Sequence, residues 1–214
     1  MTGVLRRRQA LGLLAAALPV AAARAEEPWH DIDVTGTSPR LDLAMQATPE
    51  GQAVSQANYA GYVTLLYFGY TFCPDVCPLT MQNVAEALAK TGEAAKNIRF
   101  LFVTVDPKRD TIPVLKAYVS LFGPGFVGLR GDADQLELLA KRFRIAYSVT
   151  PSPDPSKYEV THSSAIYVFD RQGNARLLVP SMASNAPDID GLAADLVRLV
   201  NERPSWFGWL RALV

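Results

Sequence analysis

The feature that most constrains the fold is a run of apolar, β-branched and aromatic residues over Val63–Tyr70. Such a continuous run predicts a strand that is buried on both faces of a sheet. A helical pattern follows, and Pro78 suits its first turn because a proline there loses no hydrogen bond. The junction between strand and helix holds Cys73 and Cys77, which are the only two cysteines of the chain.

The rest of the pattern alternates strands with helices. Strands are predicted over residues 41–46, 52–54, 63–70, 98–105, 126–129, 164–169 and 175–179, and helices start near residues 79, 110, 132 and 188. Asp132 and Gln135 form a capping box, whereas three prolines make residues 150–156 an irregular loop. This order predicts an α/β, thioredoxin-like fold in its peroxiredoxin-like variant. A mixed β-sheet is sandwiched by helices and preceded by an N-terminal β-hairpin.

The first 25 residues are typical of an export signal. Arg6–Arg8 precede an apolar stretch, and Ala23-Arg24-Ala25 fits a cleavage site. The stretch is shorter than the roughly 20 residues of a membrane-spanning helix, although an uncleaved anchor stays open as an alternative. Both twin-arginine and general secretion remain possible routes. We therefore expect a periplasmic protein.

Four parts of the chain follow from this pattern: a signal peptide over residues 1–25, a leader segment over 26–40, one thioredoxin-like domain over 41–202 and an aromatic tail over 203–214. The chain has 214 residues, about half of them apolar, which suits a single domain. Tryptophan and phenylalanine in the tail would allow contact with a membrane surface or packing on the domain.

Charge gives no reason to expect a nucleic-acid partner. The chain has 21 basic and 21 acidic residues, and four of the arginines lie in the signal. Removing the signal would leave the remainder mildly acidic, whereas nucleic-acid-binding domains are basic.

The two cysteines allow three interpretations. A structural disulfide would stabilise the fold only weakly, because closing a loop of about five residues removes only ~2 kcal/mol of unfolded-state entropy. A redox dithiol is favoured by Cys77 at a helix N-terminus, where the pKa of a thiol is lowered. The spacing leaves three residues between Cys73 and Cys77, whereas thioredoxin-type motifs have two. The third interpretation is a soft-metal site.

A metal site would need a third ligand, and His162 is the candidate. It precedes the strand predicted over residues 164–169, and in a thioredoxin-like fold the loop entering that strand faces the first helix N-terminus. His30 lies in the leader segment and is expected to be solvent-exposed. Two thiolates with one imidazole suit copper better than a closed zinc site, which takes four ligands.

Three motifs carry a family resemblance. Tyr67–Pro78 (YFGYTFCPDVCP), Val105–Thr111 (VDPKRDT) and the segment from His162 to Gly173 resemble those of the SCO/SenC family. Members of that family are thioredoxin-fold copper-binding proteins that assist assembly of the binuclear copper site in subunit II of cytochrome c oxidase. The family's copper ligands match Cys73, Cys77 and His162.

The resemblance implies a periplasmic metallochaperone that binds Cu(I), Cu(II) or both and has cytochrome c oxidase subunit II, or another periplasmic copper or thiol protein, as its partner. The alternative is a thiol-disulfide oxidoreductase in which Cys73 and Cys77 form the catalytic redox dithiol and reduce the cysteines of the copper acceptor. A peroxidase and a copper sensor also stay open. Thr161 departs from the family, in which an acidic residue often precedes the histidine.

Secondary candidates have ordinary interpretations beside functional ones. Asp106 and Asp110 could help dock a partner, or they could end a strand and cap a helix. Asp75, between the cysteines, could tune a metal or stand as an exposed turn residue. The methionines Met45, Met81 and Met182 are better explained as core or surface residues than as soft ligands.

Overall fold

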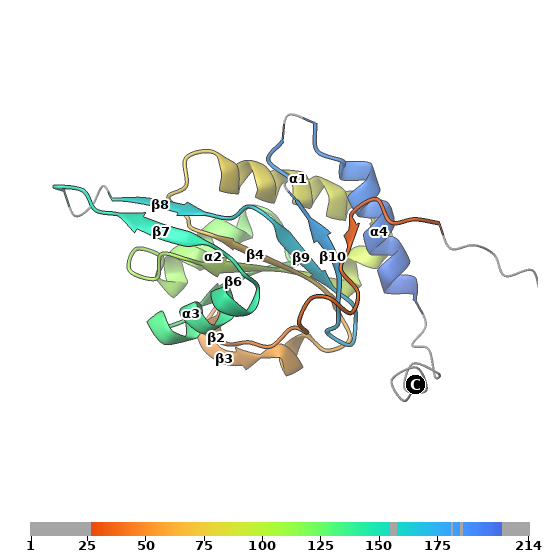
Figure 1. Ribbon diagram of the computed structural model, residues 1–214, viewed down its shortest axis with the longest axis horizontal. Helices are drawn as coiled ribbons and strands as arrows, with labels where there is room; N and C mark the ends of the chain where they lie inside the picture. Colours follow the sequence, from red (N-terminus) through yellow and green to blue (C-terminus); the bar gives the residue numbers. More distant parts are fainter. Residues whose placement is uncertain (1–26, 155–157, 181, 185, 203–214) are drawn as a thin grey trace, which may run out of the picture.

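The computed structural model describes residues 27–154, 158–180, 182–184 and 186–202. An eight-stranded sheet has the order β1-β10-β9-β4-β5-β6-β2-β3, and helices lie on both of its faces (Figure 1). The strands of this sheet are β1 (Ile32–Asp33), β2 (Ala44–Ala47), β3 (Gln52–Ser55), β4 (Val63–Gly69), β5 (Ile98–Thr104), β6 (Phe126–Arg130), β9 (Ile166–Phe169) and β10 (Ala175–Val179). The α-helices are α1 (Val76–Lys90), α2 (Ile112–Ser120), α3 (Ala133–Arg142) and α4 (Ile189–Asn201). Short 3₁₀ helices span Gln56–Tyr59 and Gly92–Asn97.

Strand β4 lies at the centre of the sheet, and all seven of its residues are buried. It pairs in parallel with β5, which pairs in parallel with β6, while the other neighbours are antiparallel. Helices α1 and α2 lie on the same face, because Tyr67 contacts Cys77 of α1 and its partner across the sheet, Phe102, contacts Tyr118 of α2. The predicted mixed sheet, N-terminal hairpin and thioredoxin-like arrangement are therefore confirmed.

Alternate residues of the sheet separate the two layers of helices. Tyr67 of β4 directs its hydroxyl to Cys77 of α1. On the other face Tyr167, which pairs with Leu66, donates its hydroxyl to the carbonyl of Phe143 at the end of α3. Helices α1 and α3 therefore cover opposite faces, with the metal-binding candidates on the α1 side.

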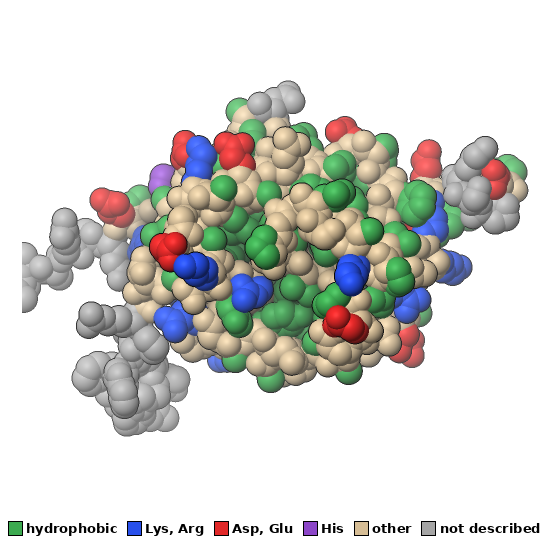
Figure 2. Space-filling model, turned by 180° about the vertical axis from the view of Figure 1, so that it is seen from behind, with side chains coloured by type: hydrophobic (Ala, Val, Ile, Leu, Met, Phe, Trp, Pro, Cys, Tyr) green, Lys and Arg blue, Asp and Glu red, His purple; other side chains and the backbone are tan. Residues whose placement is uncertain are grey.

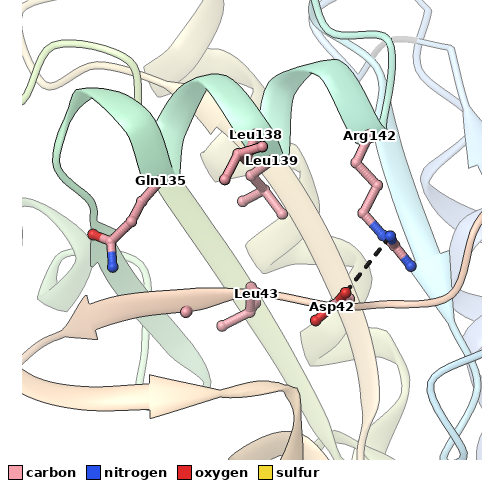
Figure 3. A pocket seen from close by; sticks show the side chains of 7 residues that line it. Asp42, Leu43, Gln135, Leu138, Leu139 and Arg142 are labelled. Atoms are coloured by element: carbon pink, nitrogen blue, oxygen red, sulfur yellow. Dashed lines mark ion pairs between the residues drawn. The ribbon is translucent and has the colours of Figure 1, made fainter.

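Helix α3 covers the β2–β3 end of the sheet. Its predicted capping box is present, since Asp132 accepts from the Gln135 amide at 2.8 Å and Gln135 accepts from the Asp132 amide at 3.0 Å. Figure 3 shows Leu139 above Leu43, with Arg142 reaching to Asp42, and the two charged groups lie 3.6 Å apart. The shallow hollow between them holds neither thiol nor imidazole.

The segment before β2 is joined to the sheet and to α4. Strand β1 pairs with β10, and the backbone amides of His30 and Asp31 each donate to Asp195 of α4 at 3.0 Å. The guanidinium of Arg198 stacks on the Trp29 ring at 3.7 Å. Residues 27–33 thus pack on the domain along α4.

The structure has a second, two-stranded sheet that the sequence did not predict. Strands β7 (Tyr147–Thr150) and β8 (Glu159–His162) form an antiparallel hairpin that projects from the domain (Figure 1). The predicted proline loop joins them, but it starts one residue later than expected because Thr150 pairs with Glu159. Val149 is exposed and its neighbours in β7 are not buried, so the sequence has no buried face there that would indicate a strand.

The face of the molecule that is turned away in Figure 1 carries both charged and apolar side chains. Figure 2 shows basic and acidic side chains interspersed over it, with apolar side chains nearer its centre. The predicted signal peptide over residues 1–25 and the predicted aromatic tail over 203–214 lie outside the described residues. Within the described part, no helix combines the length and hydropathy needed to cross a membrane.

Candidate metal centre

The cysteines are placed by the turn between β4 and α1. Helix α1 begins at Val76, and its N-cap Asp75 makes no side-chain hydrogen bond to the helix. Instead the Sγ of Cys73 accepts a hydrogen bond from the Cys77 amide at 3.4 Å. The sulfur therefore takes the place of a capping oxygen at a helix end where negative charge is stabilised.

His162 reaches the cysteines from the other sheet. It is the last residue of β8, not part of a loop as the sequence suggested, and its Nε2 lies 3.1 Å from the Sγ of Cys77. Its Nδ1 lies 3.0 Å from the carbonyl oxygen of Ser163. A carbonyl oxygen can only accept, so this contact needs a proton on Nδ1, and Nε2 is the ring atom that faces the sulfurs.

The three ligand atoms of Cys73, Cys77 and His162 lie within 4.8 Å of one another. Both cysteines are free thiols, with Cys77 buried and Cys73 partly exposed. Two sulfurs and one imidazole nitrogen form a soft donor set that suits Cu(I) or another thiophilic ion. The structure brings the predicted residues together, and their role as ligands stays a prediction.

The two thiols have opposite acidities. The hydrogen bond from Cys77 lowers the pKa of the Cys73 thiol, and hydrogen bonds from His162 and from backbone amides lower this pKa further against the effect of burial. The same hydrogen bond to Cys73, together with burial, raises the pKa of Cys77. Cys73, and not Cys77 as its place at the helix N-terminus suggested, is therefore the reactive thiolate, and Cys77 keeps its proton until a base or a metal displaces it.

Aromatic side chains of β4 and of the residue that follows it contact Cys77 and His162. The hydroxyl of Tyr67 lies 3.7 Å from the Sγ of Cys77, and the rings of Tyr67 and Tyr70 each meet the His162 ring edge-on at 5.9 Å. Gly69 lets the backbone pass close to Cys77, since a Cβ there would lie 3.0 Å from its sulfur. These contacts fix both the imidazole plane and the depth of Cys77.

The secondary candidates fall into three groups. Asp75 is exposed, so it stands at the rim of the site, and His30 is exposed as expected, with its ring 3.6 Å from Asp188. The three methionines named as candidates are core residues. Asp110 does not cap α2, because it is fully buried and binds Thr71, and Thr111 occupies the N-cap position instead.

Two further residues beside the site were not found from the sequence. Arg109 and Tyr158 contact Asp106, which is itself buried rather than exposed for docking. The DPKRD segment signalled a turn, but nothing in it indicated a partner 49 residues away.

The sheet is thioredoxin-like, two cysteines lie at the N-terminus of α1, and His162 lies opposite them. This combination is typical of proteins that react through thiols or bind a metal. Comparison with known proteins identifies the family within this class. The profile of the SCO1/SenC family matches residues 45–201, so the chain belongs to that family. The matched region includes all three candidate ligands.

Solved structures resemble this one over most of the domain. Arabidopsis thaliana ScoI with copper bound is 30% identical, with a TM-score of 0.67 and coverage of 77% of this chain and 99% of that one. Bradyrhizobium japonicum ScoI with copper bound is 31% identical, with a TM-score of 0.67 and coverage of 76% and 99%. Yeast Sco1 with copper bound is 28% identical, with a TM-score of 0.69 and coverage of 82% and 94%.

Curated relatives include the SCO2-like protein RP587 of Rickettsia prowazekii, 35% identical over 58% of this chain and 60% of the relative. Another is the mitochondrial SCO1 homolog 1 of Arabidopsis thaliana, 33% identical over 72% of this chain and 45% of the relative. The aligned part thus spans about half of the length of such curated relatives.

Proposed function

We propose that this chain is a copper-binding protein that carries the ion on Cys73, Cys77 and His162 and supplies it during assembly of cytochrome c oxidase. The convergence of the three donor atoms within 4.8 Å is the observation that carries this proposal. Membership of the SCO1/SenC family and the copper-bound relatives support it. Subunit II of the oxidase is the proposed acceptor.

The donor set suits a carrier rather than a permanent site. Copper is the cargo, and three protein ligands leave room for an incoming acceptor thiolate. Cys73 is partly exposed, so an acceptor can displace it first, and the buried Cys77 then follows with His162. Binding requires both sulfurs as thiolates, so the proton of Cys77 leaves as the ion is loaded.

The test is titration of the reduced protein with Cu(I) in competition with a chromophoric chelator. We expect one ion per chain, with affinity lowered by Cys73→Ser, Cys77→Ser and His162→Ala. The disulfide form should bind no Cu(I), because oxidation consumes both sulfurs. Wild-type affinity in His162→Ala would reject the three-ligand site.

A second candidate function is reduction of the acceptor's disulfide, and the unequal acidity of the two thiols favours it. The Cys73 thiolate would attack the acceptor disulfide, forming a mixed disulfide and releasing one acceptor thiolate. Cys77 would then attack the Cys73 sulfur, passing its proton to His162 Nε2 at 3.1 Å, and the second acceptor thiolate would leave. Two electrons move to the acceptor, and a Cys73–Cys77 disulfide remains. Turnover with copper excluded would identify this reaction.

We also propose that the protein works in the periplasm. The arginine-led apolar stretch and the small residues at positions 23–25 support export. Cell fractionation, with mass spectrometry of the mature N-terminus, tests this, and cytoplasmic protein that retains Met1 would refute it.

A further inference from the structure

Three residues outside the metal site form a compact group that we call the clasp: Asp106, Arg109 and Tyr158. The Nε of Arg109 donates to Asp106 Oδ2, and the hydroxyl of Tyr158 donates to Asp106 Oδ1 at 2.5 Å. Arg109 Nη1 donates to the Tyr158 carbonyl at 3.2 Å, and its guanidinium carbon lies 3.8 Å from the centre of the Tyr158 ring. Each member therefore contacts both of the others.

The ion pair of the clasp is largely removed from water, whereas Tyr158 is partly exposed. The side chains of Asp106 and Arg109 are 3% and 16% exposed. Hydrogen bonds between ionised groups in such surroundings are stronger than those on a surface, and a planar guanidinium also stacks on an aromatic ring. This arrangement holds Tyr158 against the loop between β5 and α2.

The guanidinium of Arg109 also faces the segment that leads to Cys73. Its carbon lies 5.1 Å from the ring centre of Phe72 and 5.8 Å from that of Tyr70. The Tyr70 ring in turn meets the edge of the His162 ring. One side chain therefore contacts the chain just before the first cysteine and the chain four residues before the histidine.

The hairpin that carries His162 needs such an attachment. Strands β7 and β8 pair with each other and stand apart from the main sheet, and a two-stranded hairpin alone is marginally stable in water. At its base Ser163 donates to the Ala146 carbonyl at 2.9 Å, a bond that joins the two strands to one another. Val160 of β8 is buried in the hydrophobic core, and the clasp adds a polar attachment at Tyr158, just before β8.

We propose that the clasp positions His162 as the third ligand, with Arg109 acting as a positioning residue for the metal site. The inference rests on the proposed copper-binding function. When the clasp is lost, the start of β8 loses its polar attachment, β8 shifts away from α1, and the imidazole leaves the two sulfurs while they stay on the main fold. The ion is then held by two thiolates.

The experiment measures Cu(I) affinity of the reduced chain by competition with bicinchoninate. We expect Arg109→Ala to lower the affinity about 10-fold, the lower end of what loss of a ligand-orienting partner costs. Tyr158→Phe removes one hydroxyl and keeps the ring, and we expect about a 3-fold loss. Arg99→Ala is the matched control, since Arg99 stacks on Tyr62 at 3.9 Å far from the site, and it should keep wild-type affinity.

A double-mutant cycle separates positioning from general damage. In a His162→Ala background, Arg109→Ala should cost nothing further, because the ligand it positions is already absent. X-ray absorption of copper-loaded Arg109→Ala should show two sulfur neighbours without the nitrogen seen in wild type. An additive loss in the cycle, a retained nitrogen, or wild-type affinity in Arg109→Ala would overturn the proposal.

Two outcomes keep the two hypotheses distinct. If His162→Ala itself binds Cu(I) like wild type, the three-ligand site fails, and the clasp proposal fails with it. If His162→Ala loses affinity and the clasp variants do not, only the clasp is rejected. Circular dichroism reports folding, and where Arg109→Ala fails to fold, the same cycle with Tyr158→Phe decides the question.

Discussion

The carboxylate of Asp110 accepts hydrogen bonds from both the amide and the hydroxyl of Thr71, at 3.0 and 2.6 Å. Thr71 lies two residues before Cys73, and Asp110 lies just before α2. A further hydrogen bond comes from Thr104 Oγ1 at the end of β5, at 2.6 Å. One buried side chain thus joins the cysteine turn to the neighbouring strand.

Replacement of Asp110 by alanine should destabilise the fold by about 2–3 kcal/mol, because the buried hydroxyl of Thr104 and the two partly buried donors of Thr71 lose their acceptor. Asp110→Asn keeps one acceptor oxygen and should lose less. Urea denaturation of both variants, each made without residues 1–25, measures the difference. Equal stability of wild type and Asp110→Ala would show that water replaces the carboxylate.

The contact between residues 27–33 and α4 should depend on pH through Asp31. Burial first, then the charges of Asp195 and Asp188, raise the pKa of this carboxyl from 3.8 to about 6, and His30 acts in the opposite direction. The folded state therefore binds this proton more tightly than the unfolded chain. Its stabilising effect is complete below pH 3.8 and is lost as the pH rises through about 6.

Asp31→Asn should remove this dependence, so the variant should gain on wild type by about 1 kcal/mol between pH 4 and pH 8, after allowance for solvent screening. Thermal unfolding of both proteins across this range gives the difference. Asp33→Asn is the control, because hydrogen bonds from Thr35 lower the pKa of Asp33. A constant difference between wild type and Asp31→Asn would contradict the prediction.

Cys73 should react with iodoacetamide at pH 6, where Cys77 stays protected. The lowered pKa keeps Cys73 a thiolate, while burial and the hydrogen bond to Cys73 keep Cys77 protonated. Mass spectrometry of peptides after brief labelling distinguishes the two sites. His162→Ala should slow labelling at pH 6, because it removes one hydrogen bond to the thiolate. A rate that rises only near the ordinary thiol pKa, ~8.5, would refute this assignment.

Gly69→Ala should damage stability and the metal site together. A Cβ at this position would lie 2.7 Å from a ring carbon of Phe102 and 3.0 Å from the Cys77 sulfur. Such overpacking costs roughly 1–3 kcal/mol, and relief of the clash would displace Cys77. Gly125→Ala, whose Cβ would meet only Ile98 O at 3.5 Å, is the matched control. Chemical denaturation and Cu(I) titration give the two readouts.

Much of the fold could be predicted because its signals are local. Val63–Gly69 is a continuous run of mostly apolar, β-branched and aromatic residues because both of its faces are buried. Asp132 with Gln135 marks the start of α3 by a hydrogen-bond pattern within four residues. Strand β7 has only four residues and is largely exposed, so its sequence contains no apolar run and too short a pattern to mark a strand. Its pairing with β8 is a tertiary fact that local pattern does not contain.

The candidate metal site likewise has some features that the local sequence indicates and others that depend on the tertiary structure. Two thiols four residues apart at a helix start are visible in the sequence, and the expected fold suggested His162. The proton arrangement of its ring depends on the Ser163 carbonyl, and the place of Asp106 depends on Tyr158, 52 residues away. Contacts between residues so far apart in the chain leave no mark in the local sequence, so they could not be predicted from it.

The separation of 85 residues between Cys77 and His162 has a consequence for heat-melting experiments. An unfolded chain still contains both sulfurs within a five-residue stretch, so it can hold Cu(I) by itself. Ligand-induced stabilisation depends on the ratio of affinities of the native and denatured states. Copper should therefore raise the melting temperature of this protein by less than its tight binding suggests. The rise would measure what folding adds to the pair of sulfurs, chiefly the imidazole.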